Sequence, residues 1–318
     1  MIRHRLLVAF GLACAVAGLH AAQVATPAPK AAATELRRPL LWKVSDADNT
    51  VYLLGSFHLL KPGDYPLPAE IDRAFEDAES LLFEIDPAVM TAPDTPARVQ
   101  AYMGYGDEPL TLSQVLPKAT LERLDTLVKA SGGSLATMEQ SEPWAVSMGL
   151  VLGITQGMGF RADLGLDRHL MARAAEAGKP AAGLETLDEQ MQAMDAVPRA
   201  EQVDSLDEFV RDPRKAVRQL DDMHAWWRTG DVDKLDRLMR VEMAEKTPAS
   251  YQLLDVARNA AWMPRIEARL QAPAGQDTLV VVGSLHLLGS DGLVEQLRAT
   301  GRYTVERVCD ACVEAPAP

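Results

Sequence analysis

Two histidines recur in one short motif and have the clearest potential for chemistry. Residues 55–60 read GSFHLL and residues 283–288 read GSLHLL, so His58 and His286 occupy the same position of one pattern. The chain has six histidines, and two in matching places suggest a shared role. The alternative is that each ring only hydrogen-bonds the backbone of its own turn. We expect the two rings to belong to a single site.

The glycines and serines that open the motifs, Gly55, Ser56, Gly283 and Ser284, mark where the chain must turn. Each pair follows an apolar run typical of a buried strand, and a glycine there lets the backbone turn sharply or approach another group closely. Residues just after such strands lie at the carboxyl edge of the sheet, where α/β proteins bind their ligands. The serines could act as nucleophiles beside the histidines, although their spacing equally suits hydrogen bonds within the turns.

Two glutamates, Glu84 and Glu185, end other apolar runs, residues 81–83 (LLF) and 181–184 (AAGL). A glutamate that closes a buried strand is costly unless it is paired, hydrogen-bonded or metal-bound; alternatively, each only caps a following helix. Two acids and two histidines form the nitrogen and oxygen ligand set of a divalent-metal hydrolase. A metal there would lower the pKa of bound water toward about 7, and a glutamate not bound to it could act as general base.

Other polar residues are weaker candidates. Asp167 and His169 share a predicted helix and are expected on its polar face, and His224 beside Trp226 and Trp227 is expected to pack in the interior. The sequence contains no GxSxG elbow, Walker loop, dinucleotide-binding fingerprint or HExxH helix. The paired histidines and the strand-end glutamates therefore remain the predicted site.

The elements that must position these residues follow from hydrophobic periodicity. The expected fold is α/β, with a central sheet built from the N- and C-terminal strand-GxxH-helix-strand repeats and a large helical middle. The predicted strands are 41–44, 51–54, 80–85, 181–184, 278–282 and 303–308. The predicted helices are 68–78, 121–130, 143–152 and 164–177, with a helical insertion at about 187–270.

The first residues are typical of an export signal. Arg3 and Arg5 precede an apolar run at residues 6–19, and small residues follow it, as in a secretory signal peptide. This run of about 14 residues is shorter than the roughly 20 that a membrane-spanning helix needs. The expected organisation is a signal peptide at 1–22, a flexible leader at 23–38, a single domain at 39–312 and a tail at 313–318. We expect the mature chain to be periplasmic or secreted without an integral membrane segment, with lipid attachment at Cys14 as the alternative.

Two cysteines remain after the expected cleavage, Cys309 and Cys312, in the sequence CDAC near the C-terminus. A thioredoxin-like redox pair would open a helix after a strand, whereas this pair follows the strand-like residues 303–308 and runs into an Ala/Pro tail. A zinc knuckle would need two more ligands nearby, and the sequence has none there. In an exported protein, the pair is expected to form a small structural disulfide.

Charge and composition exclude several classes of function. The 318 residues include 32 Lys and Arg against 45 Asp and Glu, which gives a formal net charge of −13, and no block of basic residues occurs. A nucleic-acid-binding protein would show a clustered basic face, and an anionic membrane surface attracts polybasic segments. We therefore expect no nucleic-acid partner and no docking on such a membrane.

The same residues resemble those of the TraB/PrgY/GumN family and, more distantly, the TIKI metalloproteases and the erythromycin-esterase/ChaN-like superfamily. The resemblance rests on the two GxxH motifs, on the strand-end acid in residues 82–86 (LFEID) and on residues 165–186, and it covers about residues 40–308. Similarity to TIKI proteins implies a metal-dependent peptidase that uses manganese or cobalt, with zinc as a further candidate. Carried over to this chain, the resemblance implies that His58, His286 and Glu84 bind the metal and that Glu185 joins them in catalysis.

The leading prediction is therefore an exported, metal-dependent hydrolase that cleaves a peptide or protein substrate. One alternative keeps catalysis without the metal, with a histidine as general base in an esterase-like site. A second alternative is a periplasmic protein that binds a peptide or a polysaccharide-related ligand without cleaving it. Activity that survives chelation would favour the first alternative, and recovery of intact ligand would favour the second.

Overall fold

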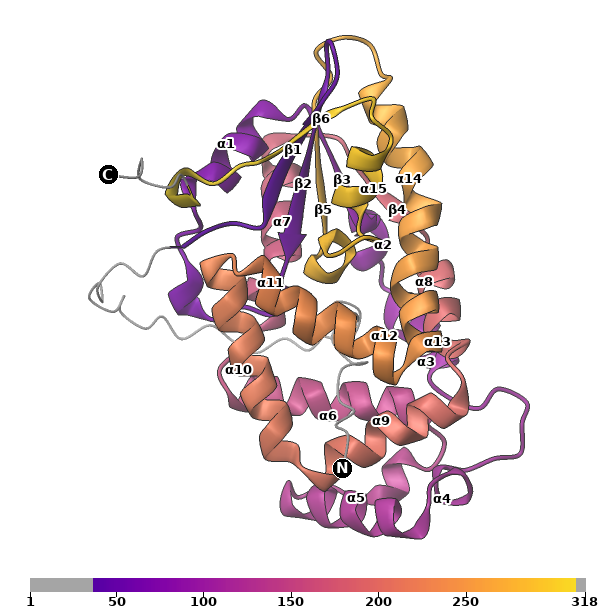
Figure 1. Cartoon of the computed structure of the whole chain (residues 1–318). Coiled ribbons are helices and arrows are strands. Elements are labelled where there is room, and N and C mark those ends of the chain that lie inside the picture. The colour runs from indigo at the N-terminus through magenta and orange to yellow at the C-terminus, as the bar shows by residue number, and fades with distance from the viewer. Residues whose placement is uncertain (1–36, 313–318) are drawn as a thin grey trace.

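A six-stranded sheet lies at the centre of the computed structural model, which describes residues 37–312 (Figure 1). The expected signal peptide at 1–22, Cys14, most of the expected leader and the tail at 313–318 lie outside these residues. The strands are β1 (Leu41–Ser45), β2 (Thr50–Ser56), β3 (Ser80–Ile85), β4 (Ala181–Glu185), β5 (Thr278–Gly283) and β6 (Thr304–Arg307). All six match the predicted strands to within two residues, because each is a short, largely apolar run and most are rich in β-branched residues or leucine.

The order of the strands across the sheet is β4-β3-β5-β2-β1-β6. β4, β3, β5 and β2 are mutually parallel, whereas β1 runs antiparallel to both β2 and β6. β5 therefore lies between β3 and β2, although it follows both by about 200 residues in the sequence. Ser56 pairs with Gly283 in the register of β2 and β5, so the two GSxHLL motifs leave the sheet side by side.

Helices cover both faces of the sheet, as the burial of its strands requires. All of β2 and most of β3 and β5 are buried, which is the pattern of a parallel sheet with two covered faces. Along the chain, the connections that contain α1 (Ala69–Asp77) and α7 (Leu166–Ala177) lead to the next strand on the β4 side of the sheet. The connections that contain α14 (Ala257–Leu270) and α15 (Leu293–Ala299) lead in the opposite direction, toward β6. Right-handed crossovers then place α1 and α7 on one face and α14 and α15 on the other (Figure 1).

The helices have the following bounds. Before β4 they are α1 (Ala69–Asp77), α2 (Pro87–Met90), α3 (Thr95–Tyr102), α4 (Leu112–Val115), α5 (Lys118–Ala130), α6 (Pro143–Gly157) and α7 (Leu166–Ala177). After β4 they are α8 (Leu187–Asp195), α9 (Arg199–Arg211), α10 (Pro213–Thr229), α11 (Val232–Leu235), α12 (Glu242–Lys246), α13 (Pro248–Tyr251), α14 (Ala257–Leu270) and α15 (Leu293–Ala299). Short 3₁₀ turns are η1 (Pro62–Asp64), η2 (Leu135–Met138), η3 (Ala162–Leu164), η6 (Ser284–Leu287) and η7 (Asp310–Cys312). Two π-helical turns are η4 (Asp236–Val241) and η5 (Gln252–Val256).

A largely helical layer lies at the carboxyl edge of the sheet, in the lower half of Figure 1. It combines α2 to α6, which come between β3 and β4, with α8 to α13, and α9 packs against both α5 and α6. The helical insertion predicted at about 187–270 is thus only part of this layer. Its last helix, α14, instead packs against β2 and β4.

The predicted disulfide is present between Cys309 and Cys312, in η7 just after β6. Asp310, between the two cysteines, pairs with Arg73 and donates its backbone N–H to Glu70. Both partners lie on α1, so the disulfide turn fastens the end of the last strand to the first helix.

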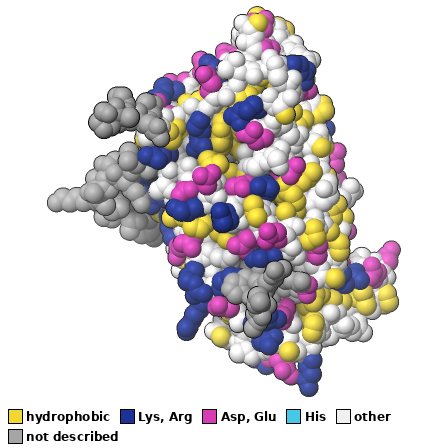
Figure 2. Space-filling view, viewed as in Figure 1, with side chains coloured by type: hydrophobic (Ala, Val, Ile, Leu, Met, Phe, Trp, Pro, Cys, Tyr) yellow, Lys and Arg dark blue, Asp and Glu magenta, His cyan; other side chains and the backbone are white. Residues whose placement is uncertain are grey.

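The face of the molecule shown in Figure 2 carries charges of both signs. On the face shown in Figure 2, Lys and Arg side chains are interspersed with Asp and Glu, and hydrophobic side chains occur between them. Among residues 37–312, no helix combines the length and the apolar character that crossing a membrane requires.

Candidate functional site

The carboxyl ends of the four parallel strands meet at one edge of the sheet. In the order of the strands, this edge presents Glu185 (β4), Glu84 (β3), Gly283 (β5) and Ser56 (β2), and the two motif histidines follow β5 and β2. Neighbouring strands lie about 4.8 Å apart. Parallel topology therefore gathers the four residues expected to be catalytic, His58, Glu84, Glu185 and His286, all of them buried.

Gly283 is the point on which three of these side chains converge. Its backbone N–H donates to Oε1 of Glu84 (2.7 Å). A Cβ atom at this position would lie 3.1 Å from Glu84 Oε1, 3.3 Å from His58 Nε2 and 3.7 Å from His286 Cδ2. Because β5 carries no side chain at this position, groups from β3 and from the segment after β2 approach each other across it.

His58 is oriented by a carboxylate. Its Nδ1 atom lies 2.9 Å from Oδ2 of Asp167, and both side chains are buried. Ser56 donates a second hydrogen bond to Asp167 Oδ1 (2.6 Å). Because a carboxylate accepts hydrogen bonds, Nδ1 of His58 carries the proton and Nε2 is the basic nitrogen of the neutral ring. That nitrogen faces Gly283 and Glu84.

Asp167 corrects one expectation from the sequence. We expected Asp167 and His169 on the polar face of one helix, but Asp167 is buried against His58 in the first turn of α7. Close packing brings it there, because a Cβ on Gly165, the residue before α7, would overlap the backbone oxygen of His58. His169 lies apart from the site, with its ring centroid 4.9 Å from that of Tyr65.

His286 has a different set of neighbours. Its Nδ1 atom lies 2.8 Å from Oδ1 of Asn259 and 3.0 Å from Oδ1 of Asp255. Its Nε2 atom lies 3.2 Å from Nη1 of Arg258, which can only donate, so Nε2 accepts that hydrogen bond. Both ring nitrogens are therefore engaged by α14 and by the π-helical turn η5 before it. Such turns occur frequently at functional sites.

Arg258 joins the two strand-end glutamates. Its Nη2 atom donates to Glu84 Oε2 (2.7 Å) and to Glu185 Oε1 (2.6 Å), and its Nε atom donates to Glu185. Gln190 also donates to both carboxylates, and Trp262 donates to Glu185 Oε2 (3.1 Å). Glu185 therefore holds Arg258 in place, and Glu84 links this ion pair to Gly283.

These contacts fix the charges at the centre of the site. Burial by itself would raise the pKa of Glu84, but attraction to Arg258, together with the hydrogen bond from the Gly283 N–H, lowers it to about 2. Burial would lower the pKa of the Arg258 guanidinium, whereas Glu84 and Glu185 raise it well above its ordinary value. Both groups are therefore charged at neutral pH.

Ser284 and the two strand-end glutamates have contacts that bear on the alternatives of turn hydrogen bonding and helix capping. Ser284 donates to the backbone oxygen of Ser56 (2.7 Å), which ties the two motifs to each other. Helix capping falls to Asp86, which accepts from the backbone at the start of α2, and to Thr186, which forms a capping box at the start of α8. The glutamates themselves face the site.

The contacts of Arg258 conflict with the predicted metal site. Among residues 37–312, no group of three or more His, Cys, Asp or Glu side chains is arranged to hold a metal ion. The obstacle is Arg258, whose guanidinium binds both glutamates and occupies the lone pair of His286 Nε2 that a metal would need. The residues thus do not fit a metal bound by His58, Glu84 and His286. Binding of manganese or cobalt at this site stays a prediction.

Several residues of the site gave no signal in the sequence. Asp255, Arg258 and Asn259 lie in the long helical middle, where one polar helix face resembles another. The i and i+4 spacing of Asp255 and Asn259 indicates a shared face, but nothing local connects that face to the sheet edge. Gln190 and Trp262 likewise reach the site only through the packing of α8 and α14.

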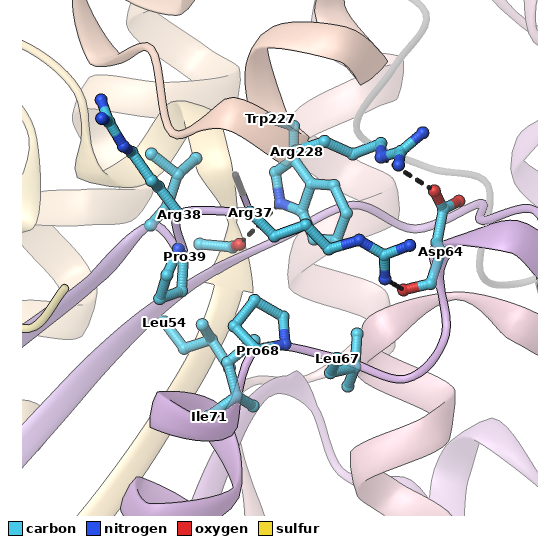
Figure 3. A pocket seen from close by; sticks show the side chains of 12 residues that line it. Arg37, Arg38, Pro39, Leu54, Asp64, Leu67, Pro68, Ile71, Trp227 and Arg228 are labelled. Carbon is cyan, nitrogen blue, oxygen red and sulfur yellow. Dashed lines mark hydrogen bonds and ion pairs between the residues drawn. The ribbon is translucent and has the colours of Figure 1, made fainter. Parts of the chain in front are cut away.

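His224 lies outside the site and packs in the interior, as expected. Its Nε2 atom lies 2.8 Å from Asp64 Oδ2, and its ring packs against Phe57 and Phe160. Beside Asp64 lies a cavity of about 20 Å³, enough for about one water molecule. Figure 3 shows Asp64 with two arginines, Arg37 and Arg228, reaching toward it. This cavity is lined by the first motif's Gly55 but by neither motif histidine.

The fold and the site define an α/β protein with paired motif histidines and buried glutamates at the carboxyl edge of its sheet. The model of the TraB/PrgY/gumN family matches residues 40–307, and the chain belongs to this family. It is similar to the "Uncharacterized protein YbaP" of Escherichia coli (strain K12), with 26% identity over 249 residues, 78% of this chain and 87% of YbaP. YbaP of Shigella flexneri gives the same values. No solved structure matches the chain.

Proposed function

We propose that this chain is an exported hydrolase in which His58, oriented by Asp167, activates a water molecule. The observation that carries the proposal is the buried 2.9 Å contact between His58 Nδ1 and Asp167 Oδ2, which directs the basic Nε2 toward Gly283. A carboxylate in this position holds the ring in one tautomer and stabilises the imidazolium that forms when the base takes a proton. His58 is therefore the general base of the proposed reaction.

The proposed reaction moves one proton in two transfers, forms one bond to the carbonyl carbon and breaks another. Nε2 of His58 takes a proton from water as the water oxygen attacks the carbonyl carbon of the substrate. The imidazolium then returns that proton to the leaving group as its bond to carbon breaks. Glu84, ionised and held by Gly283 and Arg258, accepts a hydrogen bond from the attacking water and orients it. The reaction requires a substrate whose carbonyl group reaches the side of the His58 ring that faces Gly283.

The substrate class and the location rest on separate supports. The resemblance to TIKI proteins supports a peptide or protein substrate, and the erythromycin-esterase-like relationship supports a metal-independent route. The expected signal peptide at 1–22 supports export, and the disulfide between Cys309 and Cys312 is compatible with an oxidising compartment. We propose a periplasmic or secreted enzyme on these grounds.

The test is digestion of a peptide library and an ester panel by the purified mature chain. Each reaction is run once with a chelator and once with added manganese, cobalt or zinc. The same reactions are repeated with the variants His58→Ala and His169→Ala. We expect cleavage that survives chelation, falls by about 10³-fold in His58→Ala and persists in His169→Ala, the matched control outside the site. Cleavage that is unchanged in His58→Ala would contradict the proposal. Saturable binding with intact ligand would instead support a binding protein.

A further inference from the structure

We propose that Arg258 is the built-in cation of this site and that its guanidinium fills the place where Glu84, Glu185 and His286 would otherwise hold a divalent metal. This inference concerns what the site binds, so it stands whether or not the chain hydrolyses a substrate. It reverses the expectation that Glu84 and His286 are metal ligands.

The hydrogen bonds of the guanidinium account for all of its donors. An arginine side chain has five N–H groups in one plane. Nε donates to Glu185, Nη2 donates to Glu84 and Glu185, and Nη1 donates to His286 Nε2 (3.2 Å) and to the backbone oxygen of Leu254 (3.0 Å). The three side chains with suitable ligand atoms therefore direct lone pairs at one group that already carries a positive charge.

The position of Arg258 is fixed by its surroundings. It is buried on α14, one turn after Leu254 and one turn before Trp262. Its Cζ atom lies 4.7 Å from the centroid of the Trp262 ring, and the indole N–H of the same residue donates to Glu185. Gln190 donates to both glutamates from α8. Elements on several sides of the guanidinium thus keep it and its two carboxylates together.

Displacement of Arg258 by a metal would be unfavourable. If the guanidinium left, a buried positive charge would lose both of its carboxylate partners, which is strongly destabilising. If the guanidinium stayed, it would repel a divalent ion, because it lies within hydrogen-bond distance of the side chains that would bind that ion. Thiolate or additional carboxylate ligands could offset such repulsion. Among the described residues, however, Glu84 is the acid that lies within 4.0 Å of His286 Nε2, and Asp255 contacts the opposite ring nitrogen, Nδ1.

The inference predicts a latent metal site. Removing the positive charge while keeping the apolar stem, as in Arg258→Met, would leave Glu84, Glu185 and His286 around a space that a metal can enter. Carboxylate and imidazole groups together suit manganese, cobalt and zinc. Arg258→Lys keeps the charge and should keep the metal out.

The experiment is titration of the purified chain with cobalt(II) and with manganese(II), followed by calorimetry and by the absorption spectrum of bound cobalt. We expect no saturable binding by the wild type or by Arg258→Lys. Arg258→Met should bind one equivalent of cobalt with saturation, at concentrations at least about 100-fold below those at which the wild type shows any binding, since ligand orientation alone changes metal affinity by roughly 10- to 100-fold. Arg265→Met, an exposed arginine on the same helix, is the matched control and should behave as the wild type does.

Each result bears on the inference. One equivalent bound by the wild type and lost in Glu84→Gln would overturn it, as would Arg258→Met that folds and binds nothing. If Arg258→Met does not fold, the double variant Arg258→Met/Glu185→Gln removes one charge of each sign and retains Glu84 and His286. Failure of the folded double variant to bind cobalt would also overturn the inference. None of these readouts depends on catalytic activity, so failure of the hydrolase proposal is separately visible.

Discussion

Residues 55–60 and residues 283–288 have nearly the same sequence and follow neighbouring parallel strands, yet their histidines are held in different ways. His58 has a carboxylate, Asp167, at Nδ1 and directs Nε2 toward Gly283. His286 has both ring nitrogens engaged by residues of η5 and α14, among them Arg258. The repeated motif therefore determines where each histidine leaves the sheet, whereas the helices packed against it determine the hydrogen-bond partners of each ring.

The glycines of the two motifs differ in the same way. A Cβ on Gly55 would lie 3.0 Å from Leu40 Cβ and 3.3 Å from Leu287 Cδ1, which are atoms of the core, and 3.1 Å from Ser284 Oγ of the second motif. A Cβ on Gly283 would meet Glu84 and His58 instead. The first glycine thus allows close packing, and the second keeps space open between polar groups.

The largest expected difference between the two motifs is catalytic. Asp167→Asn should reduce turnover by about 10³-fold, because a neutral amide no longer stabilises the imidazolium of His58. Asp255→Asn, the equivalent change beside His286, should reduce turnover by about tenfold or less, since His286 then acts only in positioning. Steady-state kinetics on the substrate from the library digest measures both. Equal losses in the two variants would show that the histidines share one role.

The next difference concerns stability, and it should be larger on the His286 side. Glu185→Ala removes a buried partner of Arg258 and should lower the free energy of unfolding by about 3–5 kcal/mol. Asp167→Asn preserves a hydrogen-bonding side chain of the same shape and should cost about 1–2 kcal/mol. Urea denaturation followed by circular dichroism compares them. A smaller loss in Glu185→Ala than in Asp167→Asn would mean that Arg258 is held mainly by other contacts.

The two glycines offer a third comparison of smaller size. Gly55→Ala should cost about 1–3 kcal/mol of stability through overpacking against Leu40 and Leu287. Gly283→Ala should leave stability closer to that of the wild type but lower turnover by about 100-fold, because it pushes reacting groups out of position. Thermal unfolding and kinetics of the same two preparations give both values. A catalytic loss in Gly55→Ala equal to that in Gly283→Ala would erase the distinction.

The smallest expected effect lies in the turn after the first motif. Burial opposes ionisation of Asp64, but hydrogen bonds from His224 and the Lys61 N–H lower its pKa below the ordinary 3.8. A lowered carboxyl pKa contributes stability that is present above the ordinary value and is lost as the pH falls through the folded-state value. The melting temperatures of the wild type and Asp64→Asn should therefore converge as the pH falls below about 4. A gap that widens on acidification would mean that the sign is wrong.

Much of the sheet was predictable from the sequence because its signals are local. The runs at 80–85 and 278–282 are short and apolar, and the matching GSxHLL units indicate equivalent strand ends. Parallel pairing then requires that Glu84 and the two histidines meet at one edge. This reasoning uses only strand ends and topology, which short-range patterns can reveal.

The partners of the histidines were not predictable in this way. Asp167 lies 109 residues from His58 in the sequence, and Arg258 lies 174 residues from Glu84. Both are on helices whose orientation depends on tertiary packing, so a polar residue there looks like any solvent-facing residue in the sequence. The sequence therefore indicated the predicted metal ligands but not the arginine that lies among them.

The position of β5 also determines when the site comes into existence. During synthesis, β2 and β3 are complete long before β5. In the sheet, however, β5 lies between them and pairs with both. Until residues 278–286 are made and inserted, Glu84 has no Gly283 N–H to accept and His58 has no facing strand. A chain that ends before Gly283 therefore lacks the centre of the site, so the site cannot form during synthesis until β5 has been made.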